Sequence, residues 1–321
     1  MFPNYLILTP DGVGSTYLQR ALTVYLNCAG IEYWNTHELL NGLRLENGNL
    51  YKDQSLNYTQ STSKICQLLL ESKCNLVSRI ANYHINTRLK HKQEDYGKLY
   101  NTCNLKFNKI LYCTRDPFEY ALSWSIRWNT KVLNVYSIAE RIDVHSEDTK
   151  QTIDINYFYK KLQDYVSYEY WVNDNFNISQ SVKYNELHRN VDQVLQEITG
   201  LDYSTSNYLG VSLQDFSLFR YKASLYKQTQ DRKHLQGMNN HKVAGYLKVK
   251  RIAHDLISKK QLVNTIPVKM NTLQDKQNRI TNFDDAVDMY NTWATGTNDH
   301  PQLTQQIIKN RILEEDIIYA A

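Results

Sequence analysis

A short apolar run, followed by a glycine loop and an amphipathic stretch, constrains the fold of this chain most. Tyr5 to Thr9 is apolar and meets Pro10 and two glycines, which predicts a buried strand entering a turn. From Ser15 the apolar residues recur at helical spacing instead, and this pattern ends near residues 27–30. The residues of the apolar stripe are Leu18, Leu22, Tyr25 and Leu26. The sequence therefore begins with a strand, a glycine loop and a helix.

Further strands and helices alternate along the chain. Strands are expected at 31–34, 75–80, 109–114 and 181–184, and helices at 63–70, 117–128, 157–171 and 191–199. Apolar strands that alternate with helices predict a parallel sheet covered on both faces. We therefore expect an α/β fold, with a P-loop-type three-layer α/β/α core of about five parallel strands over residues 1–205. A mostly helical C-terminal region, residues 206–321, is expected to pack on that core.

The composition favours a globular protein without a metal site or a membrane anchor. The 37 basic and 33 acidic residues give a net charge of +4, which does not by itself indicate nucleic-acid binding. Five cysteines without C-x-x-C spacing predict neither zinc nor disulfides. Neither a signal peptide nor a run of 18 apolar residues occurs, so we expect a cytoplasmic protein. The richness in tyrosine, asparagine and lysine suits an AT-rich genome, such as that of a phage or a marine bacterium.

One segment of the chain is markedly basic. Between Arg220 and Lys260 there are eleven Lys or Arg residues, against only Asp231 and Asp255. Three roles are open for it: covering the phosphates of a nucleotide, docking a polyanionic acceptor, or forming a solvated helical face.

The glycine loop has the character of a phosphate site. Backbone N–H groups of such a loop and of the following helix attract a phosphate, and the hydroxyls of Ser15 and Thr16 add donors. The ATP- and GTP-binding form of this loop carries Gly-Lys-Ser/Thr, which is missing here. On its own, the loop is equally compatible with a structural turn.

A second motif sharpens this interpretation. The stretch from Ile110 to Trp128 places Arg115 at the end of a strand, and Asp116-Pro117-Phe118-Glu119 then forms a helix-start signature. Ser123 follows seven residues after the expected N-cap and returns to the same side of the helix two turns later. Arg115 and Ser123 are thus expected to hold one anion from two directions.

These two motifs resemble those of the sulfotransferase family, which uses 3′-phosphoadenosine 5′-phosphosulfate (PAPS). That family has P-[KR]-S-G-[ST]-T-[WL]-L after its first strand and R-[ND]-P-x-[DE]-x-x-[AV]-S later. Residues 12–19 and 115–123 of this chain resemble these two patterns, in the same order and at fitting spacing. Residues 182–187 are similar to a later Y-E-D-L unit of the family. The resemblance covers about residues 1–202 and is closest to the bacterial and phage-like branch.

The resemblance implies a PAPS site without a metal. Arg115 and Ser123 would hold the 3′-phosphate, and the loop would hold the 5′-phosphosulfate. The expected loop residues are Gly12, Val13, Gly14, Ser15 and Thr16. Tyr17 would either stack near the adenine or pack in the core.

Gly12 departs from the family pattern, because it stands where the family has a basic residue. Sulfuryl transfer depends on positioning and on electrostatic stabilisation, so another cation would have to take this role. Arg79, at the end of a strand, and Arg20, on the first helix, are the nearest candidates. Arg79 is alternatively a surface salt-bridge partner, and Arg20 a solvated residue.

A general base must accept the proton of the acceptor hydroxyl. By resemblance to the bacterial branch, Glu38, in a short segment after the second strand, is the first candidate, with His37 beside it. His84, after the third strand, is similar in place to a histidine of the animal cytosolic branch. Each of the three is equally compatible with a structural role on the surface.

Three functions are open on the sequence alone. The first is a PAPS-dependent sulfotransferase acting on a hydroxyl or amine of a small molecule, glycan or peptide, with neither a nucleic-acid nor a membrane partner. The second is a P-loop kinase or another ATP- or GTP-binding enzyme. The third is a PAPS- or nucleotide-binding protein that has the sulfotransferase fold without catalysis.

Overall fold

The structure is a computed structural model of the 321-residue chain. It describes residues 2–10, 12–13, 15–28, 31, 33–41, 62–73, 75–81, 96–130, 150–202 and 272–320. The chain divides into two compact units, which are described separately. The first falls within Met1–Thr114 and Tyr170–Ile266, and the second within Arg115–Glu169 and Pro267–Ala321.

The first unit contains a parallel sheet of five strands within the described residues. In order across the sheet, these are β2 (Tyr33–Glu38), β3 (Asn75–Ala81), β1 (Tyr5–Thr9), β4 (Lys109–Thr114) and β5 (Gln180–Lys183). Each neighbouring pair is parallel. All five residues of the central strand β1 are buried, as expected for a strand covered on both faces.

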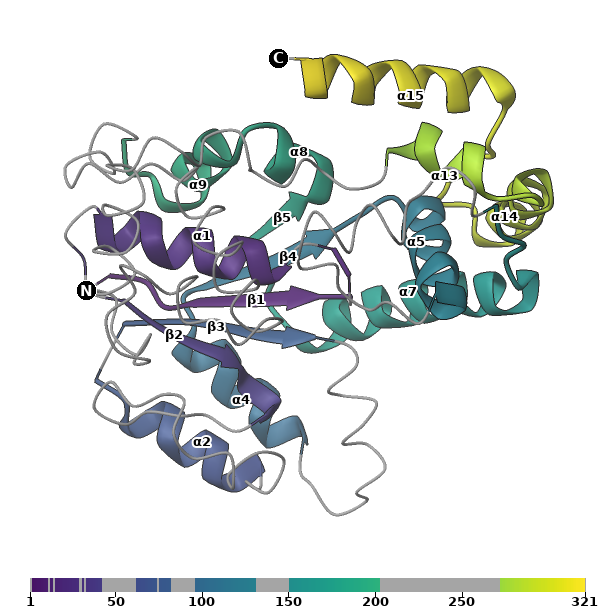
Figure 1. Ribbon diagram of the computed structural model, residues 1–321. Coiled ribbons are helices and arrows are strands. Elements are labelled where there is room, and N and C mark those ends of the chain that lie inside the picture. The colour runs from purple at the N-terminus through teal and green to yellow at the C-terminus, as the bar shows by residue number, and fades with distance from the viewer. Residues whose placement is uncertain are drawn as a thin grey trace, which may run out of the picture. The chain divides into compact units, whose positions relative to one another are not determined.

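Helices lie on both faces of this sheet (Figure 1). They are α1 (Ser15–Cys28), α2 (Thr62–Glu71), α4 (Tyr96–Lys106), α8 (Tyr184–Arg189) and α9 (Val191–Thr199), and a short 3-10 helix, η1 (Leu39–Asn41), follows β2. Helices α1 and α9 pack together over one face, and α2 and α4 pack together over the other. The predicted α/β fold with a three-layer core is confirmed.

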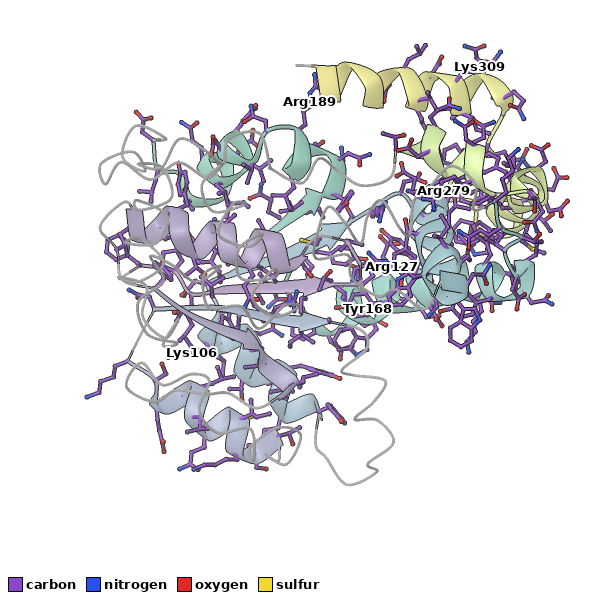
Figure 2. All side chains as sticks on the ribbon, viewed as in Figure 1. Lys106, Arg127, Tyr168, Arg189, Arg279 and Lys309 are labelled. Atoms are coloured by element: carbon purple, nitrogen blue, oxygen red, sulfur yellow. The ribbon has the colours of Figure 1, made fainter. Side chains whose placement is uncertain are left out.

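Two hydrogen bonds join the ends of neighbouring elements in this unit. Lys106, labelled in Figure 2, ends α4 and donates from its Nζ to the carbonyl of Ser72 after α2, at 2.6 Å. The side chain of Asn4, just before β1, accepts from the backbone N–H of Leu76 in β3 at 2.7 Å. Such bonds satisfy backbone groups at the ends of elements that have no partner within the element itself.

In its described residues, the second unit is helical. It contains α5 (Pro117–Thr130), α13 (Leu273–Arg279), α14 (Phe283–Thr297) and α15 (Gln305–Ala320). It also contains the first part of α7 (Ile155–Asn175), as far as Glu169. Phe118 of α5 forms the centre of its core and lies edge-on to Phe158, Phe283 and Tyr290, with ring centroids 5.5–5.7 Å apart. These aromatic contacts join α5 and α7 to the C-terminal helix α14.

Backbone pairing joins the same segments. The N–H of Gln151 donates to the carbonyl of Arg279 at 2.8 Å, and the N–H of Thr281 donates to the carbonyl of Gln151 at 3.0 Å. The grouping of residues 115–169 with the C-terminal helices was not indicated by the sequence. The boundary predicted at residues 205 and 206, and the basic segment 220–260, lie outside the described residues.

Candidate functional site

The strand order of the first unit defines where a ligand is expected. Strands β1 and β4 are neighbours in the sheet. After β1 the chain continues to β2 on one side of this pair, and after β4 it continues to β5 on the other side. In parallel α/β sheets, ligands bind at the carboxyl edge where neighbouring strands send their connections in opposite directions. This switch point lies between β1 and β4, and the glycine loop directly follows β1.

The loop has the backbone of a tight turn. Gly12 has a φ of 85°, in the left-handed region that residues with a Cβ enter only at a cost of about 1–2 kcal/mol. Val13 is fully buried, and Ser15, the first residue of α1, is only 6% exposed. The conformation at Gly12 explains why a basic side chain does not occupy this position.

The other predicted loop residues lie at the start of α1. Gly14 lies outside the described residues. Thr16 and Tyr17 belong to the first turn of α1, where the structure describes their backbone. The first N–H groups of this 14-residue helix have no acceptor within the helix, and such groups favour an anion.

Arg79 lies at this loop. It belongs to β3, beside Ile7 of β1, and its Nη1 donates to Ser15 Oγ at 3.2 Å. Arg79 is 6% exposed, so its interpretation as a surface salt-bridge partner is wrong. Burial raises the pKa of the Cys113 thiol to about 12, and the Arg79 charge opposes this rise. The guanidinium on β3 therefore also influences β4, the strand on the other side of β1. The structure thus places a buried cation beside the glycine loop.

The candidate bases Glu38 and His37 are the last two residues of β2. This strand is longer than predicted, so both residues lie within it and not in a segment after it. The Cα of Glu38 pairs in register with that of Arg79 on β3, which brings two of the predicted catalytic residues onto adjacent strands. His84 lies outside the described residues, and Arg20 lies on α1.

Arg115 is held by its backbone and by its side chain, in the second unit. The Tyr165 hydroxyl accepts from the N–H of Arg115 at 3.3 Å and donates to its carbonyl at 2.8 Å. Nη2 of Arg115 lies 3.5 Å from Oε2 of Glu119, and both side chains are almost fully buried. One hydroxyl therefore binds both the N–H and the carbonyl of Arg115, and the guanidinium is directed along α5.

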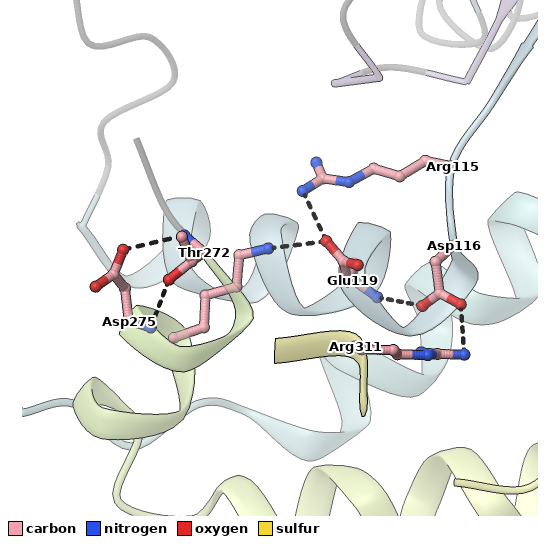
Figure 3. Close-up of polar contacts among 7 residues, drawn as sticks. Arg115, Asp116, Glu119, Thr272, Asp275 and Arg311 are labelled. Atoms are coloured by element: carbon pink, nitrogen blue, oxygen red, sulfur yellow. Dashed lines mark hydrogen bonds and ion pairs between the residues drawn. The ribbon is translucent and has the colours of Figure 1, made fainter. Parts of the chain in front are cut away.

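The predicted start of α5 is confirmed. The side chain of Asp116 accepts from the N–H of Glu119 at 3.0 Å, three residues later, which is the N-cap geometry (Figure 3). Ser123 lies two turns further along α5 and is half-buried. Because Arg115 and Ser123 belong to the second unit, their joint action with the glycine loop on one nucleotide stays a prediction.

Sequence reasoning missed two cations that pair with Glu119 and Asp116. Lys276 of α13 is 1% exposed, and its Nζ lies 3.5 Å from the same Glu119 oxygen. Arg311 of α15 lies 3.0 Å from Oδ2 of Asp116 (Figure 3). Both come from the C-terminal region, more than 150 residues from their partners, and no local pattern marks them. A lone lysine in a short polar helix is ordinarily read as solvated.

Neither a metal-ligand cluster nor a membrane-spanning helix occurs in the described parts of the chain. Across these residues no group of three or more His, Cys, Asp or Glu side chains is placed to hold a metal ion. Among the helices described, none combines the length and apolar character needed to cross a bilayer.

The chain was compared with known proteins. No protein-family model matches it, and no curated protein matches it. Among solved structures, the crystal structure of a sulfotransferase from Alicyclobacillus acidocaldarius is similar, with a TM-score of 0.36 and 15% identity over 72% of this chain and 96% of that one. A likeness of this degree does not assign an activity.

Proposed function

We propose that this chain is a sulfotransferase that moves a sulfuryl group from PAPS to a hydroxyl or amine of an acceptor. Two motifs that resemble the family in residue type, spacing and order support this. The glycine loop also stands at the switch point of a parallel sheet, where such folds bind nucleotides. The acceptor classes compatible with the proposal are small molecules, glycans and peptides.

The observation that carries the proposal is the buried Arg79 guanidinium beside Ser15. The sequence lacks the loop cation on which sulfuryl transfer depends, and Gly12 has a backbone that disfavours one. Arg79 supplies a positive charge from β3 instead, together with the N-terminus of α1. A fixed cation in a buried position stabilises developing negative charge more effectively than a solvated one.

The chain's own residues account for the steps of the reaction. PAPS supplies the sulfuryl group; the acceptor oxygen bonds to sulfur as the bond from sulfur to the 5′-phosphate oxygen breaks. Glu38 takes the acceptor proton, with His37 as the alternative base on the same strand. Arg79 neutralises charge that collects on the departing 5′-phosphate, and Arg115 and Ser123 bind the 3′-phosphate.

Calorimetry with adenosine 3′,5′-bisphosphate (PAP), combined with turnover of labelled PAPS, tests this proposal. We expect Arg79→Leu to weaken PAP binding about 10–100-fold, because it removes charged hydrogen bonds. Arg79→Lys should retain part of the affinity. The matched control is Arg189→Leu, at an exposed arginine at the end of α8 that is labelled in Figure 2 and should leave binding unchanged.

The alternatives give different results in the same assays. A non-catalytic binder would bind PAP without turning over labelled PAPS in a screen of hydroxyl and amine acceptors. A kinase would bind ATP more tightly than PAP. Transfer that Glu38→Gln abolishes, while PAP affinity is retained, would identify Glu38 as the base.

A further inference from the structure

Gln19 is a buried polar residue at the end of the loop-and-helix motif, residues 12–19. Its side chain is only 1% exposed, and glutamine is rarely buried to this extent in proteins. Its amide Nε2 donates to the backbone carbonyl of Val77 on β3 at 3.2 Å. The buried amide therefore joins α1 to a strand that lies 58 residues further along the chain.

This bond runs alongside the one from Arg79 to Ser15, and the two have a common geometry. Ser15 and Gln19 are four residues apart, so they lie on the same side of α1. Val77 and Arg79 are two residues apart, so their side chains point to the same face of β3. Each bond is 3.2 Å long. One turn of the helix is thus attached at both its ends to one two-residue repeat of the strand.

The pairing of β3 with β2 is irregular at the same two residues. Asn35 of β2 pairs with Val77. Glu38 pairs with Arg79, which lies two residues later on β3 but three residues later on β2. An irregularity of this kind disrupts the hydrogen-bond ladder locally. With β1, on its other side, β3 keeps a regular parallel register. The bond from Gln19 therefore adds a fixed point to β3 where its pairing with β2 is disturbed.

We propose that Gln19 is a positioning residue: it holds β3 in the place from which the Arg79 guanidinium reaches the glycine loop. This inference rests on the proposed function, in which Arg79 neutralises charge on the 5′-phosphate. A fixed cation stabilises developing charge best, and a misplacement of about 1 Å can cost about 100-fold in rate. The helix that begins at the phosphate loop thus also carries the amide that fixes the strand of the cation.

A purely structural contact makes different predictions from a positioning one. If the Gln19 amide only stabilises the fold, its loss should weaken every nucleotide alike, and by the same factor whether or not Arg79 is present. If Gln19 acts through Arg79, its loss should weaken only nucleotides that carry a 5′-phosphate. The effect should then disappear once Arg79 has been removed, because coupled residues are not additive.

The experiment is calorimetry with PAP, adenosine 5′-monophosphate and adenosine 3′-monophosphate. Gln19→Met keeps the length of the side chain and removes the amide. We expect it to weaken PAP and the 5′-monophosphate about 3–10-fold, and the 3′-monophosphate less than about twofold. In the Arg79→Leu background, the same substitution should weaken PAP less than about twofold. The matched control is Thr102→Val, which removes a buried hydroxyl that donates within α4 to the carbonyl of Lys98 and should leave the affinity for all three nucleotides unchanged.

Each outcome decides a specific point. Unchanged PAP affinity in Gln19→Met, equal weakening of all three nucleotides, or an undiminished effect in the Arg79→Leu background would overturn the role of Gln19 while the proposed function stands. A wild type that binds no PAP would overturn the proposed function itself, and the inference with it. If Gln19→Met does not fold, Gln19→Leu carries the same predictions. Failure of both variants to fold would contradict the inference, because it would assign the amide to stability.

Discussion

The hydroxyl of Tyr165 is the contact that fixes the backbone at Arg115, so Tyr165→Phe isolates its contribution. The hydroxyl donates to the Arg115 carbonyl at 2.8 Å and accepts from the Arg115 N–H at 3.3 Å. Tyr165 is 2% exposed, so water does not readily replace the lost oxygen. The ring packing against Tyr120, with centroids 5.1 Å apart, is retained by phenylalanine.

The expected cost follows from these two bonds. Removing the partner of a buried hydrogen bond costs about 1–3 kcal/mol, and the longer bond from the N–H adds less. We therefore expect Tyr165→Phe to lower the free energy of unfolding by about 2 kcal/mol. PAP affinity should also fall, because a less rigid backbone at Arg115 holds its guanidinium less firmly in position.

Chemical denaturation followed by circular dichroism measures the stability change, and calorimetry measures PAP binding. The matched control is Tyr170→Phe on the same helix, where the side chain is 60% exposed and should contribute less than about 0.5 kcal/mol. Equal stability of the two variants would contradict a stabilising role of the Tyr165 hydroxyl at the Arg115 backbone. If Tyr165→Phe lowered stability but left PAP affinity unchanged, the link from the Arg115 backbone to binding would be refuted.

Three other predictions concern separate features of the chain. Gly12→Lys introduces the basic residue of the sulfotransferase pattern, but it should lower stability by about 1–2 kcal/mol because of the positive φ at this position. It should not raise PAPS turnover, and thermal melting and a transfer assay check both expectations. Burial raises the pKa of Glu169 above its usual 4.5, against the opposing charge of His300, so the folded state holds this proton to higher pH than the unfolded chain. Stability should then fall as pH rises from about 4.5 through the raised value, and Glu169→Gln should flatten denaturation midpoints over that window. Because burial raises its pKa to about 12, the Cys113 thiol should resist alkylation in the native state at neutral pH. Mass spectrometry checks this: an alkylated Cys113 peptide from the native protein would contradict the prediction.

Local patterns predicted much of the fold, because the buried faces of strands and helices require apolar residues at regular spacing in the sequence. The buried run of β1 and the Asp-Pro start of α5 are both found where the sequence indicates them. Helix α4 was missed because only Leu99, Thr102 and Cys103 of its residues are buried, which leaves a weak stripe. Strand β2 was predicted too short because its second half is polar.

The site was predictable only in part, because its charges come from distant segments. A cation to replace the one missing at Gly12 could be sought among nearby arginines, but the choice of Arg79 depends on β3 lying beside β1, which is a matter of strand order. Lys276 and Glu119 form an ion pair that only the tertiary fold brings together. Pairing between residues this far apart has no signature in one sequence, whereas caps and glycine turns do.

Titration of PAP into the wild type and into Arg79→Leu and Arg115→Ala, with adenosine 5′-monophosphate as the second ligand, tests most directly whether one nucleotide contacts both motifs. The account predicts one PAP per chain, loss of PAP affinity in both variants, and loss of monophosphate affinity in Arg79→Leu alone. Absence of PAP binding to the wild type, or an Arg115→Ala variant that weakens both nucleotides equally, would contradict it.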